Sequence, residues 1–468
     1  MANYRTPGVY IEEIPKFPPS VAAVETAIPA FIGFTARARR DGEDRTLRPT
    51  RITSLLEYVE YFGLAQPEEN IVVTAERTLD GGKTVKELWT AAIVGDSSRH
   101  LMFYALQSFF DNGGGPCYIV SVGTYLTTFG GAIPRAPLED GLNALRTEDE
   151  PTLIIFPEGQ GMDAGEYFGL LNVALQQCND LKDRFVIMDL PIPERDLTNT
   201  RREQAVAAFR GGVTQFLKYG AAYFPNIRTV FNYAKDESKV KIVVTENGSP
   251  QPDKALGDLN NAERSKAMLA IDSLSISLPP SSSVAGVYAR VDESRGVWKA
   301  PANETINSLD GLSFKITDDI QDGLNVDDTD GKSINCIRYF IGKGYKIWGA
   351  RTLAGNDNEW RYIPVRRFFN MVEESVKKAS SQFVFEPNDA NTWLRVKTMI
   401  ENFLILQWRD GALQGIKTEH AFYVKVGLNE TMSALDILEG RMIVEIGMAV
   451  VRPAEFIILR FSHKMAES

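Results

Sequence analysis

Residues Thr152–Pro191 read TLIIFPEGQGMDAGEYFGLLNVALQQCNDLKDRFVIMDLP. The stretch begins with a short apolar strand, continues into a segment whose Leu171 and Cys178 share one helical face, and ends in a second apolar strand. Asp163 and Glu166 predict an N-terminal cap for that helix. Two strands joined by a helix of this length are expected to run parallel, because the helix crosses back over the sheet. The stretch therefore predicts an α/β domain with helices packed on a largely parallel sheet.

The same alternation of strands and helices extends to both sides of this stretch. Further strands are predicted at 27–36, 116–123 and 220–226, and further helices at 98–111, 200–212 and 281–296. Thr200 and Glu203 predict a capping box for the second of these helices. Gly296 is expected to end the last one. The polar stretches at about 37–95 and 230–262 do not continue the alternation and are expected to be surface insertions.

From about Gly344 the pattern changes to long helices followed by strands. Apolar residues at helical spacing predict two helices, one through Phe368, Val372, Val376 and Ala379, the other through Leu394, Met399, Phe403 and Leu406. Strands are predicted at 421–427, 441–447 and 454–462. This predicts an α+β domain over 344–468, an α/β region over 26–343, and an N-terminal arm and linker over 1–25.

The first predicted strand has no partner nearby in the sequence. Val9–Ile14 alternate as a half-buried strand does, but Pro15, Pro18 and Pro19 follow directly and rule out a tight hairpin. Such a strand either stays disordered or adds to a sheet edge elsewhere. The predicted strand at 454–462 is also apolar on both faces. Both ends of the sequence are therefore expected to be adhesive.

Composition narrows the class of protein. The chain has 468 residues, which suggests two to four domains, and its hydrophobic and charged fractions of 44% and 24% are those of a globular protein. A net charge of −10 argues against a nucleic-acid partner. Three scattered cysteines fit buried thiols in a reducing compartment, and neither a signal peptide nor a membrane span is expected. The sequence thus indicates a globular protein made in the cytoplasm.

The sequence motifs that resemble nucleotide-binding or metal-binding sites are incomplete. The stretch DGGKTV at Asp80–Val85 lacks the first glycine of a phosphate-binding loop, since position 77 is Arg77, and a plain turn is the better interpretation. DDTDGKS at Asp327–Ser333 is rich in carboxylates, but its ligand spacing does not fit a calcium loop. The three histidines lie far apart, so no metal, cofactor or catalytic residue is predicted. A structural protein is favoured, while an enzyme with an α/β core and a binding module remain alternatives.

Several longer stretches together resemble one known family. They are TPGVYIEEI, IPAFIGFTA, FFDNGGGPCYIVSV, PPSSSVAGVYARVDESRGVWKAPAN, IGKGYKIWGARTL, WRYIPVRRFF, FEPNDANTW and RPAEFIILRF, in this order from residue 6 to residue 461. In that order they resemble the contractile tail sheath proteins of myophages, R-type pyocins and phage-tail-like injection particles. Pro279–Asn303 and the stretch from Gly342 to Trp393 are the most specific. The segments near 37–95 and 230–259 match nothing in the family pattern.

The resemblance implies a fold and a function. The fold is expected to be α/β and α+β multidomain, with an outer α/β part and an inner C-terminal α+β domain completed by the N-terminal arm and by strands from neighbouring subunits. The chain is expected to polymerise helically around a tail tube, assembling in the bacterial cytoplasm with tube, baseplate, terminator and sheath paralogue partners. The strands implied to pair between subunits are Val9, Tyr10, Ile11, Glu12, Glu13 and Ile14, and Phe456, Ile457, Ile458, Leu459, Arg460 and Phe461.

Basic residues gather on the two predicted C-terminal helices of an otherwise acidic chain. They are Arg366, Arg367, Lys377, Lys378, Arg395 and Lys397. One interpretation is a surface that contacts an acidic tube. The other, of equal weight, is a pair of solvated helix faces with partners four residues away, such as Glu373 and Lys377.

Overall fold

The computed structural model describes residues 21–192 and 198–460, which form two compact units. Of the described residues, the α/β unit comprises 25–192, 198–371 and 452–460, and the C-terminal unit comprises 372–451 together with 21–24. Residues 344–371 therefore group with the α/β unit, although the change of sequence pattern near Gly344 predicted a boundary there.

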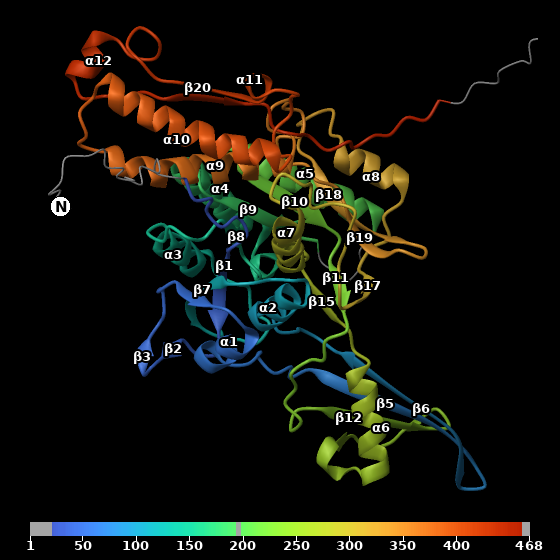
Figure 1. The fold of residues 1–468 in the computed structure, drawn as a ribbon. Helices are drawn as coiled ribbons and strands as arrows, with labels where there is room; N and C mark the ends of the chain where they lie inside the picture. The colour runs from blue at the N-terminus through green and yellow to red at the C-terminus, as the bar shows by residue number, and fades with distance from the viewer. Residues whose placement is uncertain (1–20, 193–197, 461–468) are drawn as a thin grey trace, which may run out of the picture. The chain divides into compact units, whose positions relative to one another are not determined.

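A nine-stranded sheet forms the centre of the α/β unit, in the order β16-β19-β18-β10-β9-β8-β1-β7-β4 (Figure 1). The strands are β1 Pro29–Thr35, β4 Thr50–Ile52, β7 Cys117–Thr124, β8 Leu153–Ile155, β9 Phe185–Asp189, β10 Gly220–Phe224, β16 Glu304–Thr305, β18 Ile334–Phe340 and β19 Gly344–Trp348. From β18 to β7 every pairing is parallel, and β4, β16 and β19 join antiparallel at the edges. The predicted α/β fold with a mostly parallel sheet is confirmed.

Helices cover both faces of this sheet because its strands are apolar on both sides. On β1, Ala30 and Ile32 contribute to one hydrophobic cluster and Phe31 to the other. The first cluster packs against α3 Arg135–Leu145, α4 Ala164–Leu181 and α5 Asn199–Gly212. The second packs against α1 Leu55–Phe62, α2 Met102–Asp111 and α7 Ser281–Arg295. Strands buried on both faces are what crossover connections require.

The predicted helix caps are partly wrong. Helix α4 begins after Asp163 as expected, but the Asp163 side chain makes no capping hydrogen bond. Helix α5 begins two residues earlier than predicted, because the hydroxyl of Thr198, not of Thr200, accepts a hydrogen bond from the Arg201 amide. Helix α7 ends at Gly296, whose φ of 90° suits a glycine, as expected.

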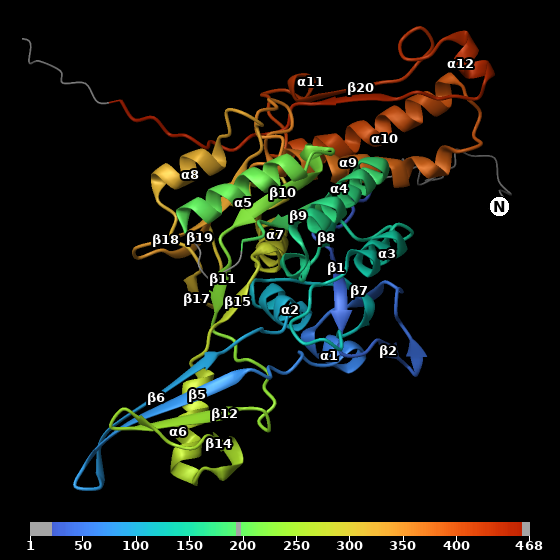
Figure 2. The same ribbon diagram turned by 180° about the vertical axis from the view of Figure 1, so that it is seen from behind.

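Two distant segments form a separate small sheet with its own core, here called the small domain. Strand β12 Lys241–Glu246 pairs in parallel with β5 Ile71–Asp80, and β5 pairs with β6 Lys83–Ile93. Helix α6 Asn261–Asp272 packs on this sheet (Figure 2). The short strands β13 Ser249–Pro250 and β14 Lys254–Ala255 both pair with β12. The segment 37–62, predicted to be part of an insertion, instead contributes β4 and α1 to the main body.

Smaller elements complete the α/β unit. They are β2 Arg39–Arg40 paired with β3 Glu43–Asp44, a three-stranded sheet of β15 Ile276–Leu278, β11 Ile227–Thr229 and β17 Leu309–Leu312, and helix α8 Asp318–Asn325.

The C-terminal unit is α+β, as predicted. Helix α9 Ile363–Ser380 runs into it from the α/β unit, and α10 Ala390–Arg409, α11 Thr418–Ala421 and α12 Ala434–Leu438 follow. Strands β20 Phe422–Lys425 and β21 Glu445–Met448 pair antiparallel. The predicted face of α10 is half wrong: Met399 and Phe403 are buried, whereas Leu394 and Leu406 are 64% and 53% exposed.

Candidate assembly site

The C-terminal segment presents apolar side chains to solvent. Phe456, Ile457, Ile458 and Leu459 are 68–80% exposed. The prediction of a strand here is not met within the chain, because residues 454–460 pair with no strand of the described chain. The other predicted pairing residues, Val9–Ile14 and Phe461, lie outside the described residues. An extended segment with exposed apolar side chains and unpaired backbone groups is suited to adding to a sheet edge.

The sheet of the C-terminal unit has strand edges that pair with no further strand of the described chain. Among the residues that the structure describes, β20 and β21 pair only with each other, and a single bridge between Leu413 and Val450 extends their ladder. A two-stranded sheet is barely stable alone and leaves a row of backbone donors and acceptors open on each side. Apolar side chains of the same unit are also exposed, including Phe385, Ile416 and Leu438 at 83% or more. Within the described residues, the unit therefore combines sheet edges with exposed apolar side chains.

Two of the six basic residues on the C-terminal helices are buried. Arg366 is 2% exposed, its guanidinium lies 4.4 Å from the Trp360 ring centre, and its Nε donates to Asn370 at 2.7 Å. Arg367 is 3% exposed and its Nη2 lies 2.5 Å from an Asp292 carboxylate oxygen. Aromatic and carboxylate partners inside the chain thus satisfy both cations, so neither is placed at the surface.

The other four basic residues lie at or near the surface of the C-terminal unit. Lys377 and Lys378 on α9 approach the buried Glu374 carboxylate at 3.0 and 3.5 Å. Arg395 on α10 is exposed, 3.6 Å from Glu386, and Lys397 is half-buried. For these four residues, both the tube-facing surface and the solvated helix face stay predictions.

The carboxyl edge of the main sheet, where α/β enzymes place their sites, is occupied by polar side chains that bond one another. His100 and Glu158 are buried, with Nδ1 and Oε1 3.0 Å apart. The amide of Leu126 donates to Nε2, so the ring proton sits on Nδ1 and is donated to Glu158. Glu158 also accepts from the Phe34 amide, while burial raises its pKa.

Neighbouring polar groups at this edge are likewise paired. Gln160 and Asn226 exchange two amide hydrogen bonds of 2.9 and 2.7 Å. Asp189, at the end of β9, accepts the Ser281 amide at 2.8 Å at the start of α7. These side chains hold loops and a helix in place.

The motifs set aside in the sequence are turns. Gly81 and Gly82 of DGGKTV form the β5–β6 hairpin turn with φ of 55° and 77°, values that favour glycine. Asp327 of DDTDGKS is buried, accepts the amides of Thr329 and Asp330, and lies 3.4 Å from Arg210. The carboxylate therefore folds its own loop. All three cysteine thiols are buried, as predicted.

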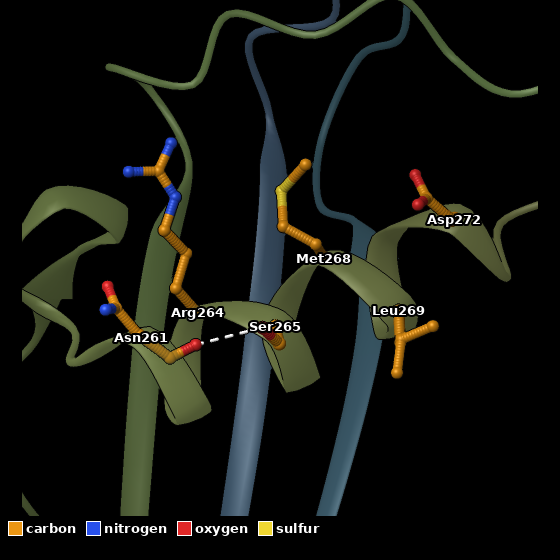
Figure 3. Close-up of a pocket in the computed structure, with 6 residues that line it drawn as sticks. All are labelled: Asn261, Arg264, Ser265, Met268, Leu269 and Asp272. Carbon is orange, nitrogen blue, oxygen red and sulfur yellow. Dashed lines mark hydrogen bonds between the residues drawn. The ribbon is translucent and has the colours of Figure 1, made fainter.

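A pocket of about 550 Å³ lies along α6 of the small domain (Figure 3). Three of its polar side chains already have partners, since Arg264 pairs with Glu237 and Asp272 with Lys235, and the Ser265 hydroxyl donates to the Asn261 carbonyl. Leu269 is 71% exposed at its rim. Its charged groups are therefore engaged within the small domain, and they do not form the set of convergent free polar groups typical of a small-molecule site.

Sequence reasoning missed the residues that hold the root of the C-terminal segment. Glu455 bonds the Arg351 guanidinium, at 2.7 Å for the shortest contact. The only sequence signal for it is one acidic residue inside an apolar run, and nothing in the sequence identifies its distant partner.

None of the helices formed by the described residues has the length and apolar character that crossing a membrane requires.

Comparisons with known proteins point in one direction. The family model for the phage tail sheath C-terminal domain matches residues 355–464. The tail sheath protein of Burkholderia phage BcepMu is 31% identical over 144 residues, which span 30% of this chain and 30% of that protein. The match thus covers well under two thirds of this curated relative.

Solved structures match over nearly the full length. A sheath complex of the extracellular contractile injection system PVC, in its contracted state, is 31% identical with a TM-score of 0.66, covering 99% of both chains. The helical sheath of the anti-feeding prophage, also contracted, is 32% identical with a TM-score of 0.65, covering 98% of this chain and 100% of that one. With such identity across the whole of both chains, the chain belongs to the contractile tail sheath family.

Proposed function

We propose that this chain is the repeating subunit of a contractile sheath, which polymerises helically around an inner tube and shortens to drive the tube through a target envelope. The observation that carries the proposal is the full-length similarity to sheath subunits of contracted injection systems. The exposed apolar C-terminal segment and the open two-stranded sheet give the chain the means to link to its copies.

The proposed links are strands exchanged between subunits. Phe456–Phe461 and Val9–Ile14 add to sheet edges of neighbouring copies, with β20 and β21 as the acceptor sheet. Main-chain hydrogen bonds hold such a strand whatever its side chains, so the link survives while the bodies it connects rotate. The exposure of Phe456 to Leu459 supports this, because covering four apolar side chains stabilises the assembly by roughly 25 cal/mol per Å² removed from water.

Contraction is proposed to run on energy stored during assembly. Subunits assemble in a metastable extended state and release free energy as new interfaces bury apolar surface. No nucleotide is required for such a step. In this scheme Lys377, Lys378, Arg395 and Lys397 face the tube, and the small domain lies on the outside. We further propose that the particle is assembled in the bacterial cytoplasm with tube, baseplate and terminator proteins, and with any sheath paralogues.

The experiment that tests the function is electron microscopy of the chain co-expressed with its tube protein. A striated tubular sheath around a tube, in long and shortened forms, is the expected result. Discrete small particles under every assembly condition would contradict the proposal. Assays of the purified chain for nucleotide hydrolysis and for bound metal test the enzyme alternative. We expect no hydrolysis and no bound metal.

A further inference from the structure

Besides helix α9, two extended stretches connect the C-terminal unit to the α/β unit. The chain passes between the units at Val24–Glu25 near its start and at Val451–Arg452 near its end. These are also the stretches from which the two adhesive terminal segments lead. On the α/β side, a buried arginine holds the chain within a few residues of each passage.

The first arginine is Arg367, which holds the N-terminal stretch at Thr26. Its Nη2 donates to the Thr26 carbonyl at 2.9 Å and to Asp292 Oδ2 at 2.5 Å, while its Nη1 donates to Oδ1 at 3.1 Å. The Thr26 hydroxyl donates to the same Asp292 carboxylate at 2.6 Å. The guanidinium carbon of Arg367 lies 4.5 Å from the Tyr288 ring centre. The side chains of Arg367 and Asp292 are only 3% and 6% exposed, so water does not weaken the pair.

The second arginine is Arg351, which holds the C-terminal stretch at Glu455. Its Nε and Nη2 donate to the two carboxylate oxygens at 2.9 and 2.7 Å, a bidentate pair. Asn325 Nδ2 and the Tyr362 hydroxyl donate to the same carboxylate at 2.7 and 3.1 Å. Burial would raise the pKa of Glu455, but the hydrogen bonds from Arg351 and Asn325 outweigh it and lower that pKa.

Both arginines are connected to neighbouring residues of strands β10 and β18 in the main sheet. The Tyr288 hydroxyl beside Arg367 bonds the Tyr223 hydroxyl of β10 at 2.7 Å. The backbone of Arg351 exchanges two hydrogen bonds of 2.8 Å with the fully buried Asn335 side chain of β18. Strands β10 and β18 are parallel neighbours, and Tyr223 is the register partner of Asn335. The two anchors therefore rest on adjacent residues of one ladder.

We propose that Arg367 and Arg351, with Asp292, Glu455, Tyr223 and Asn335, form one bracket that fixes the roots of both terminal segments to neighbouring points of the sheet. A pull on one segment is then carried through the β10–β18 pair to the other. The segments of each subunit act as the two ends of a single stiff link. The part of the proposal that concerns contraction depends on the proposed sheath function, whereas the anchoring itself does not.

Spin labels on the full-length chain test the anchoring without any assembly. Glu25 and Ala454 are exposed and adjacent to the two anchors, and the three native thiols are buried. Single variants Glu25→Cys and Ala454→Cys therefore each carry a nitroxide at one root. Each is combined with Glu455→Gln or with Asp292→Asn, which keep side-chain size and remove a charge. Circular dichroism of every variant verifies the fold.

Reciprocal effects are expected. Glu455→Gln should roughly double the mobile fraction of the nitroxide at 454 and leave the one at 25 unchanged, and Asp292→Asn should do the reverse. No change at either label would overturn the anchoring. Equal changes at both labels in both variants, with the fold retained, would show general loosening and would also overturn it.

The shared backing is tested by Tyr288→Phe, which keeps the ring beneath Arg367 and removes the hydroxyl that reaches β10. We expect a smaller rise in mobility at 25 and none at 454. An unchanged signal at 25 would show that the Tyr288–Tyr223 contact does not hold Arg367 on β10, and it would overturn the single bracket. In assembled sheaths, Glu455→Gln should permit assembly and reduce the fraction of sheaths that contract fully. Full contraction at parental efficiency would overturn the role of the bracket in transmitting force and leave the anchoring itself intact.

Discussion

At the scale of single residues, burial decides what the charged side chains of this chain do. Glu68 and Asp189 are each 2% exposed, and burial raises the pKa of both carboxyls to about 7. One oxygen of each accepts a backbone amide, Ser98 for Glu68 and Ser281 for Asp189, but these bonds do not offset the loss of hydration. Both groups therefore make stability depend on pH in the neutral range.

The sign of that dependence gives the first prediction. An unfolded aspartate titrates near 3.9, so a folded pKa of about 7 means that the native state binds more protons between these values and loses stability as pH rises through them. Asp189→Asn removes the titrating group and keeps the acceptor oxygen. The fall in unfolding free energy from pH 5 to pH 8 should be smaller in the variant by about 1–3 kcal/mol, measured by urea denaturation. An identical pH profile in parent and variant would show that Asp189 is ionised in the fold without cost.

Arg366 carries the second prediction. Its planar guanidinium stacks among Trp360, Tyr219 and Phe369 and bonds Asn370, contacts that an ammonium does not reproduce. Arg366→Lys should therefore lower the unfolding free energy by about 2–4 kcal/mol. Lys377→Ala, at a side chain that is 65% exposed, is the control and should stay within about 0.5 kcal/mol of the parent. Parental stability of the Arg366 variant would argue against its structural role.

At the scale of elements, the sequence predicted what local periodicity encodes. The β8–α4–β9 succession and the ending of α7 at Gly296 follow from apolar spacing and a glycine, and both are present. The small domain was not predicted, because β5 pairs with β12 far along the chain and no local pattern records that pairing. Arg366 and Arg367 were predicted at the surface, since a charge in the sequence does not show the aromatic and carboxylate partners that tertiary structure brings to it.

The small domain has its own core, which gives a third prediction. Ile242 on β12 is fully buried among Ile71, Val73 and Ala267. Ile242→Ala should destabilise the small domain by about 2–5 kcal/mol while the main sheet stays intact. Hydrogen exchange should accelerate in β5, β6 and β12 and not in β8 or β9. Matching acceleration in the main sheet would mean that the two cores unfold as one.

The C-terminal segment gives the fourth prediction. Ending the chain after Glu455 removes Phe456–Leu459, which contribute little to the chain's own core, and keeps the anchor on Arg351. The melting temperature should change by less than about 2 °C, because a loss of a few tenths of a kcal/mol shifts it little in a chain this long. Polymerisation should fail. Removing only residues 464–468 is the control and should leave polymerisation intact.

At the scale of the whole molecule, the two units differ in how completely the chain covers its own sheets and apolar side chains. Its main sheet is covered on both faces by its own helices, whereas the C-terminal unit leaves a two-stranded sheet with open edges and several exposed apolar side chains. The sequence predicted adhesive ends but not their acceptors, which in the proposed assembly belong to other copies. What the fold leaves unpaired is the part that assembly is proposed to complete.

The last prediction concerns the contact with the tube. If the basic surface of the C-terminal unit meets an acidic tube, the paired change Lys377→Glu and Arg395→Glu should prevent sheath from forming on tubes while the chain stays folded. Lowering the salt concentration should strengthen parental assembly and worsen the variant, since the Debye length grows from about 8 Å at physiological salt to roughly 30 Å at 0.01 M. The matched control is Lys83→Glu with Lys86→Glu on the exposed β6 of the small domain, which has the same change of charge and should assemble normally. Co-sedimentation with preformed tubes at two salt concentrations measures the effect. Normal assembly of the Lys377 and Arg395 variant at both salt concentrations would leave these side chains as a solvated helix face.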